Sequence, residues 1–202
     1  MAYITVIQPA AAEGKLAELF QRVRAPNGQV DNVLQIHSLR PHTMEGHMAL
    51  YKAVLHHSGN RLPKWFLESV GVLVSMLNGC GYCARHHSEG LKRLLKSEPG
   101  HFEACLEQLQ STEPGPPFTA AQSAALNYAR KLTLSPGDIV QQDIDALRGA
   151  GISDGEILEI NQVASYFAYA NRTVAGLGVN TAGEQLGLSP HDSTESGDWN
   201  HS

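Results

Sequence analysis

Apolar residues recur every three or four positions along most of the chain, and this spacing constrains the fold more than any other feature. It is the period of an α-helix that buries one face. Strand patterns are nearly absent, since only the short segment 3–7 could pair. The fold class is therefore predicted to be all-α. The expected helices cover residues 12–25, 44–55, 64–77, 80–96, 102–109, 119–132, a short segment through 143–147, and 153–173.

Glycine, proline and capping residues mark where these helices begin and end. Asn78-Gly79 interrupts what would otherwise be one long helix, and residues 114–117 read Pro-Gly-Pro-Pro, which predicts a loop. Two helices begin with the spacing of a capping box, in which Ser or Thr precedes Gln or Glu by three positions. The two boxes are Thr119 with Gln122 and Ser153 with Glu156.

A chain of 202 residues and 21.8 kDa suits one domain with a sizeable core. We assign residues 1–190 to a single-domain helical bundle. Residues 191–202 are polar, and we predict that they form a disordered tail.

The charge balance argues against nucleic acid and membrane partners. A net charge of −5 and a pI of about 6.0 leave no basic excess to neutralise phosphates or anionic lipid head groups. No run reaches the roughly 18 apolar residues that a membrane span needs. The first residues lack the charged and apolar regions of a secretory signal, so the predicted location is the cytoplasm.

The chain has three cysteines, Cys80, Cys83 and Cys105, which are too few for the disulfide framework of a secreted protein. Cys80 and Cys83 form a Cys-x-x-Cys pair, which in a reducing compartment indicates a redox site or half of a metal site. Covalent c-type haem is excluded because Ala84 follows the pair where that motif needs His. Cys105 shares a helical stripe with Leu109, so we expect it in the core.

His87 falls on the same helical stripe as the two cysteines. At 100° per residue, Cys80, Cys83 and His87 lie at about 0°, −60° and −20°. The imidazole of His87 is one turn from Cys83 and can reach its sulfur, whereas His86 points about 120° away. A helix that begins at the cysteines favours thiolate at its positive end, and we predict that Cys83 is the thiol of lower pKa.

Glu68 is a carboxylate in an apolar helical segment, where an unpaired buried charge is costly. A straight helix would separate Glu68 from Cys80 by about 18 Å. If the chain instead folds back at Asn78-Gly79, the residue opposite Glu68 is near position 89, about one turn from His87. We therefore predict a relay of Glu68, His87 and Cys83. The alternative is a surface position for Glu68.

These four side chains support the reduction of a peroxide. Thiolate attack on the terminal oxygen gives a sulfenic acid, and a second thiol three residues away closes a disulfide before further oxidation. His87 would move the proton, and Glu68 would orient the imidazole and balance its charge. No cofactor or metal is predicted, and the disulfide would need an external dithiol reductant as partner.

Two other functions stay open at this point. A metal-binding or purely oligomeric interaction protein is less favoured, because zinc needs four ligands and the nearby extra donors are His86, His87 and Glu68. The second alternative is acid–base chemistry by Glu68 and His87 without the thiols. Five histidines between residues 37 and 57 mostly lack the spacing of a helical metal pair, and we expect them to be solvated.

The run Glu68, eleven residues, Cys80-x-x-Cys83, three residues, His87 resembles the active-site motif of alkyl hydroperoxidase D-like proteins in the carboxymuconolactone decarboxylase superfamily. The segment Asn-Gly-Cys-Gly-Tyr-Cys-Ala-Arg-His-His looks most like the branch called peroxidase-related enzymes. The likeness extends from about residue 32 to about residue 178 and so covers most of the chain.

This resemblance implies an all-helical fold, a homo-oligomer and the reduction of organic hydroperoxides. It assigns peroxide attack to Cys83, resolution to Cys80, and proton relay to Glu68 and His87. The alternative is a decarboxylase-like enzyme, because the members that named the superfamily act on a muconolactone without this cysteine pair. One position departs from the pattern, since Tyr82 stands where the best-known hydroperoxidases carry His between the cysteines.

Overall fold

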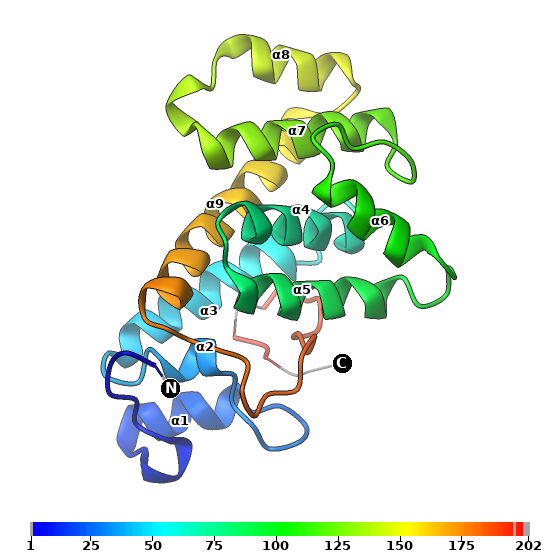
Figure 1. The fold of residues 1–202 in the computed structure, drawn as a ribbon. Helices are drawn as coiled ribbons and strands as arrows, with labels where there is room; N and C mark the ends of the chain where they lie inside the picture. Colours follow the sequence, from blue (N-terminus) through cyan, green and yellow to red (C-terminus); the bar gives the residue numbers. More distant parts are fainter. Residues whose placement is uncertain (1, 196, 200–202) are drawn as a thin grey trace.

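A computed structural model describes residues 2–195 and 197–199, and there the chain is all-helical, as predicted (Figure 1). Residues 3–7 form no strand, and an isolated β-bridge joins His57 to Ser193. Short 3₁₀ turns lie at Pro9–Ala11 and Pro136–Asp138. The α-helices are α1 (Gly14–Arg22), α2 (Asn32–Gln35), α3 (Pro41–Leu55), α4 (Lys64–Leu77), α5 (Gly81–Leu94), α6 (His101–Gln110), α7 (Ala120–Leu134), α8 (Gln141–Gly149) and α9 (Asp154–Gly176).

The chain reverses between α4 and α5 through Asn78, Gly79 and Cys80. Gly79 has a φ of 67°, a left-handed conformation that favours glycine. The N–H of Gly79 donates to the carbonyl of Met76 at 3.0 Å, and that of Cys80 to Ser75 at 2.9 Å. This is the Schellman motif that ends many helices. The two helices therefore pack as the antiparallel hairpin that the sequence predicts (Figure 1).

Helix α4 lies in the middle of the core, where α5, α7 and α9 pack against it (Figure 1). Its apolar side chains cover most of its circumference, and Val70, Val72 and Val74 are fully buried. Helix α9 approaches so closely that a Cβ on Gly71 would lie 2.2 Å from the ring of Phe167. Both predicted capping boxes are present, at the starts of α7 and α9. The hairpin of α4 and α5 is thus held from several sides.

The described part of the C-terminal segment lies against the helices. Asp192 accepts a hydrogen bond from Lys64 at 2.6 Å and lies 3.3 Å from Nδ1 of His56. Trp199 is buried among apolar residues of α1 and α3. The sequence predicts a disordered tail over 191–202, and the described residues differ because these contacts join positions far apart in the chain. The other tail residues lie outside the described part.

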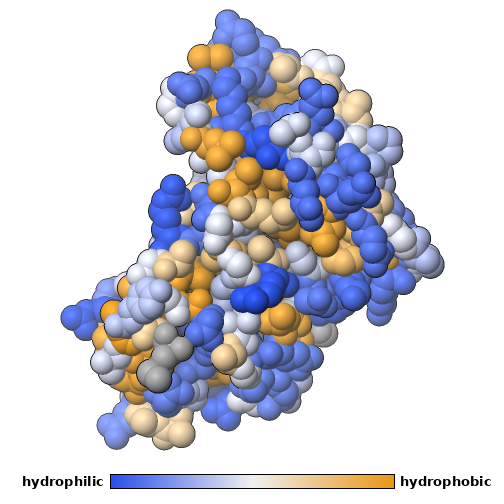
Figure 2. Space-filling model, viewed as in Figure 1, coloured by the Kyte–Doolittle hydropathy of each residue, from blue (hydrophilic) through white to orange (hydrophobic). Residues whose placement is uncertain are grey.

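Apolar side chains gather over the middle of one face, around α4, α5 and α6, with polar side chains above and below them (Figure 2). Leu94 on α5 is among the exposed apolar residues. Homo-oligomerisation stays a prediction. None of the described helices is long and apolar enough to cross a bilayer.

Candidate active site

Glu68 and His87 form a hydrogen-bonded pair between α4 and α5. Oε2 of Glu68 lies 2.7 Å from Nδ1 of His87, which confirms the contact that the hairpin predicts. The Glu68 side chain is only 3% exposed. Burial acts to raise the pKa of Glu68, but the charge and the hydrogen bond of His87 outweigh it and lower that pKa. Glu68 is therefore ionised at neutral pH and fixes the orientation of the imidazole.

Two aromatic rings from other helices contact the imidazole of His87. The ring of Phe167 on α9 meets it edge-on, with centroids 4.6 Å apart, and the ring of Tyr51 on α3 lies at 6.2 Å. Phe167 reaches this position because α9 packs closely over Gly71. Side chains from α3, α4 and α9 therefore hold His87 in place.

Cys80 and Cys83 lie at the start of α5 as buried free thiols. The pKa of Cys80 is lowered to about 6, chiefly because the thiol of Cys83 donates a hydrogen bond to its sulfur. This effect outweighs burial, and the backbone N–H groups of Cys83 and Tyr82 and the amide of Asn171 lower the pKa further. The pKa of Cys83 is raised, because its proton is held by Cys80 and because it is buried.

Cys80 therefore has a lower pKa than Cys83, which is the reverse of the predicted order. That prediction treats both sulfurs as members of one helical stripe. The break at Gly79 instead makes Cys80 the N-cap residue, where the unpaired N–H groups of the first turn stabilise a negative charge. The two thiols act as one coupled pair, which loses its first proton readily and holds the second between the sulfurs.

Asn171 on α9 ties the cysteine pair to the end of α4. Its Nδ2 donates to Oγ of Ser75 at 3.1 Å, and its Oδ1 accepts a hydrogen bond from Asn78 at 3.0 Å. Its amide also acts to lower the pKa of both thiols, although burial and the pairing dominate for Cys83. The only sequence signal for this role is a polar residue within the apolar last helix.

A cavity lies beside the pair of Glu68 and His87. Cys83 lines it, whereas Cys80 does not. The wall combines aromatic rings with a few polar groups, which is typical of sites for small molecules. A ligand in the cavity would therefore meet the sulfur of Cys83. The aromatic residues of the wall are Tyr51, Tyr82, Tyr166, Phe167 and Trp199.

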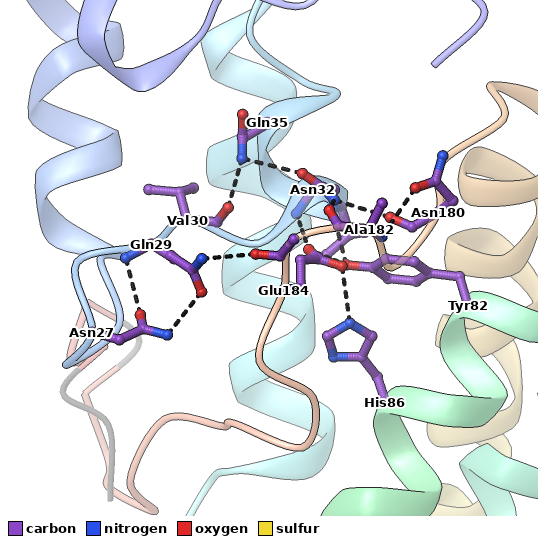
Figure 3. A network of polar contacts seen from close by, with 12 residues as sticks. Asn27, Gln29, Val30, Asn32, Gln35, Tyr82, His86, Asn180, Ala182 and Glu184 are labelled. Atoms are coloured by element: carbon purple, nitrogen blue, oxygen red, sulfur yellow. Dashed lines mark hydrogen bonds and ion pairs between the residues drawn. The ribbon is translucent and has the colours of Figure 1, made fainter. Parts of the chain in front are cut away.

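A second polar network centres on Glu184, which follows α9 in a loop (Figure 3). Its carboxylate accepts hydrogen bonds from the hydroxyl of Tyr82 at 2.9 Å and from the backbone N–H of Asn32. It also lies 3.2 Å from Nε2 of His86. Tyr82 and His86 therefore serve this network, although both also line the cavity. The helical angle of His86 predicts this separation from the thiols.

Of the five histidines predicted to be solvated, His42 is exposed, whereas three others are buried. His37, His47 and His56 are buried rather than solvated, because side chains such as Tyr51 and Tyr166 pack around them. Burial lowers the pKa of His47 to about 3, so its ring is neutral. Within the described residues, no three His, Cys, Asp or Glu side chains are arranged to hold a metal ion.

All four motif residues meet in this site, and three residues outside the motif join them: Asn171, Glu184 and Asp31. Asp31 lines the cavity. An aspartate directly before a short helix is an ordinary helix cap, so the sequence gives no signal of another role.

No protein-family model and no curated protein matches this chain. Solved structures match it over most of its length. One is described as the alkylhydroperoxidase AhpD core of an uncharacterized peroxidase-related protein from Ralstonia eutropha, with a TM-score of 0.74, 24% identity, and coverage of 89% of this chain and 91% of that chain. An uncharacterized peroxidase-related protein from a Silicibacter species gives a TM-score of 0.73, 23% identity, and coverage of 88% and 90%.

A debrominase solved in complex with 2,3,4-tribromopyrrole is also similar, with a TM-score of 0.69, 19% identity, and coverage of 89% and 91%. At these identities the likeness concerns the fold. It shows that the chain has the alkylhydroperoxidase-like fold that the motif predicts.

Proposed function

We propose that this protein is a thiol-dependent peroxidase that reduces organic hydroperoxides. In this reaction Cys80 and Cys83 supply two electrons and form a disulfide with each other. The observation that supports it most is that Cys83 lines a cavity beside the bonded pair of Glu68 and His87. Cys80 shares a hydrogen bond with the same sulfur. Two adjacent thiols can supply two electrons to a small ligand.

The proposed reaction begins with the proton held between the sulfurs. Cys83 passes this proton to Cys80 or to Nε2 of His87 and becomes a thiolate that faces the cavity. Its sulfur attacks the terminal oxygen of the hydroperoxide, the O–O bond breaks, and an alcohol leaves. Cys80 then attacks the sulfenic acid on Cys83, which forms the disulfide and releases water.

Glu68 acts in this scheme through His87. It binds Nδ1 and so leaves Nε2 as the nitrogen that exchanges a proton. We further propose that an external dithiol protein reduces the disulfide, which suits a reducing compartment such as the cytoplasm. We also propose that the protein functions as a homo-oligomer.

Consumption of an organic hydroperoxide in the presence of a dithiol tests this function. Wild type and Cys105→Ser should react alike, because Cys105 is a core residue outside the cavity. Cys83→Ser should be inactive, and Cys80→Ser, treated with hydroperoxide without the dithiol, should react once and hold a sulfenic acid that a 1,3-dione traps. Equal rates in all four proteins would refute the proposal. Activity on a lactone that resists thiol blocking would favour decarboxylase-like chemistry instead.

A second candidate function is the reductive removal of a halogen from an aromatic ring. The aromatic wall of the cavity and the fold shared with a debrominase favour it. The same dithiol would replace a carbon–halogen bond by a carbon–hydrogen bond, release halide and a proton, and become a disulfide. Release of bromide from a bromopyrrole by wild type but not by Cys83→Ser would support this candidate. Hydroperoxide turnover without bromide release would exclude it.

A further inference from the structure

Asp31 precedes α2 as its N-cap residue, yet its side chain does not cap the helix. An aspartate at this position normally accepts a hydrogen bond from the second or third residue of the helix. Within the described residues, the carboxyl group of Asp31 has no hydrogen-bond donor. It lines the cavity that also contains Cys83 and His87.

Glu184, rather than Asp31, provides the side-chain hydrogen bond at the start of α2. Its carboxylate accepts the backbone N–H of Asn32, the first residue of this helix, and the hydroxyl of Tyr82 holds it in place at 2.9 Å (Figure 3). The loop after α9 therefore satisfies the helix end that Asp31 would ordinarily cap. This exchange leaves the carboxyl group of Asp31 available to a ligand in the cavity.

The surroundings of Asp31 favour its protonated form. Burial raises the pKa of Asp31 to about 6; the nearby imidazoles act against this rise, and a second carboxylate adds to it. The carboxyl group therefore keeps its proton at pH values where an ordinary aspartate has lost it. The titratable groups that face it come from α3, α5 and the loop after α9: Tyr51, Tyr82, His86, His87 and Glu184.

We propose that Asp31 is a second catalytic acid of this site, which gives a proton to the alcohol oxygen that leaves when Cys83 attacks a hydroperoxide. The inference rests on the proposed peroxidase function. In this step an S–O bond forms to the terminal oxygen of the hydroperoxide and the O–O bond breaks. Its electron pair goes to the alkoxide oxygen, which takes the proton of Asp31. Sulfur is oxidised, the peroxide is reduced, and the products are a sulfenic acid, an alcohol and a carboxylate that solvent reprotonates.

The reaction needs one group that accepts the thiol proton and one that protonates the alkoxide. His87 suits the first task, because it is one turn from Cys83 and Glu68 holds its other nitrogen. Tyr51 and Tyr166 also line the cavity, but burial raises the pKa of both hydroxyls and makes them weak acids. Asp31 offers a much stronger acid at the same cavity.

Two oxidants with different leaving groups test this role. An alkyl hydroperoxide releases an alkoxide that needs a proton, whereas a peroxycarboxylic acid releases a carboxylate that does not. We expect Asp31→Asn to lower kcat/KM about 100-fold with the alkyl hydroperoxide and to leave it nearly unchanged with the peroxycarboxylic acid. Asp138→Asn removes an exposed acid outside the cavity and should change neither value.

Equal losses with both oxidants would indicate a structural defect and overturn the inference, and so would the absence of any loss. In either case, the proposed peroxidase function stands if the wild type is active. An inactive wild type refutes both that function and the role of Asp31. Infrared difference spectroscopy gives a readout without turnover. The carbonyl band of a protonated carboxyl group should fade as the pH rises through about 6 and be absent in Asp31→Asn. A wild type without this band would also overturn the inference.

Discussion

The carboxylate of Glu68 meets Nδ1 of His87 at 2.7 Å across two helices, although 19 positions separate the residues in the chain. The turn at Asn78-Gly79 creates this contact, because it sets α5 antiparallel to α4. The same turn makes Cys80 the N-cap residue of α5. One local reversal therefore brings the carboxylate, the imidazole and the thiols into a single site.

Glu68→Gln removes the charge and keeps the shape of the side chain. We expect the free energy of unfolding to fall by about 2 kcal/mol near neutral pH, because the imidazole of His87 loses the charged acceptor of its hydrogen bond. The folded protein lowers the pKa of Glu68, so its stabilisation is present above the usual carboxyl pKa and is lost as the pH falls through the folded value. Urea unfolding should show the two proteins converging in acid. A difference that does not change with pH would contradict the account.

Asn171→Leu removes the amide that stabilises both sulfurs. The thiolate of the wild-type pair should appear at a pH of about 6, and the variant should require a higher pH because Leu donates no hydrogen bond. The ultraviolet absorbance of the thiolate, followed against pH, measures this shift. Cys105→Ser is the matched control, because burial raises the pKa of Cys105 to about 11 and its loss should not alter the curve. An unshifted curve in Asn171→Leu would remove Asn171 from the site.

Gly71→Ala would force a methyl group against the ring of Phe167, where a Cβ would lie 2.2 Å away. We expect a loss of about 1–3 kcal/mol from overpacking. Activity should fall as well, because Phe167 contacts His87. Gly46→Ala on α3 has free space around it and should be neutral or stabilise the protein by up to about 1 kcal/mol. Similar unfolding curves for the two variants would contradict the close packing of α4 and α9.

Asp31→Asn should stabilise the protein at alkaline pH. The folded state raises the pKa of Asp31 from 3.8 to about 6, so ionisation opposes folding as the pH rises through this range. Removing the charge should add about 1–3 kcal/mol above a pH of about 7 and little below a pH of about 4. Urea unfolding at both extremes measures it. A variant that is less stable than wild type at high pH would argue against a partly buried, unpaired carboxyl group.

Much of the fold follows from local patterns. The spacing of apolar residues predicts the helices, and the capping boxes at Thr119 and Ser153 predict where two of them begin. The hairpin follows from Asn78-Gly79. The packing of Trp199 does not follow, because its partners on α1 and α3 lie far away in the sequence.

In the candidate site, too, some contacts are predictable from the sequence and others are not. The pairing of Glu68 with His87 is predictable, since one turn sets the register of the two helices. Asp31, Asn171 and Glu184 are not, because the tertiary fold brings them to the cysteines from distant segments. The pKa order of the thiols is wrong in the sequence analysis for a related reason, since helical periodicity does not tell an N-cap position from a position inside the helix.

The most direct test of the central claim is a single turnover of the reduced protein with an equimolar amount of an organic hydroperoxide, followed by mass spectrometry of the peptides that contain the cysteines. The account predicts equal amounts of alcohol and of Cys80–Cys83 disulfide, with Cys105 still a free thiol. Unreacted hydroperoxide, or hydroperoxide consumed while Cys80 and Cys83 both remain free thiols, would contradict it.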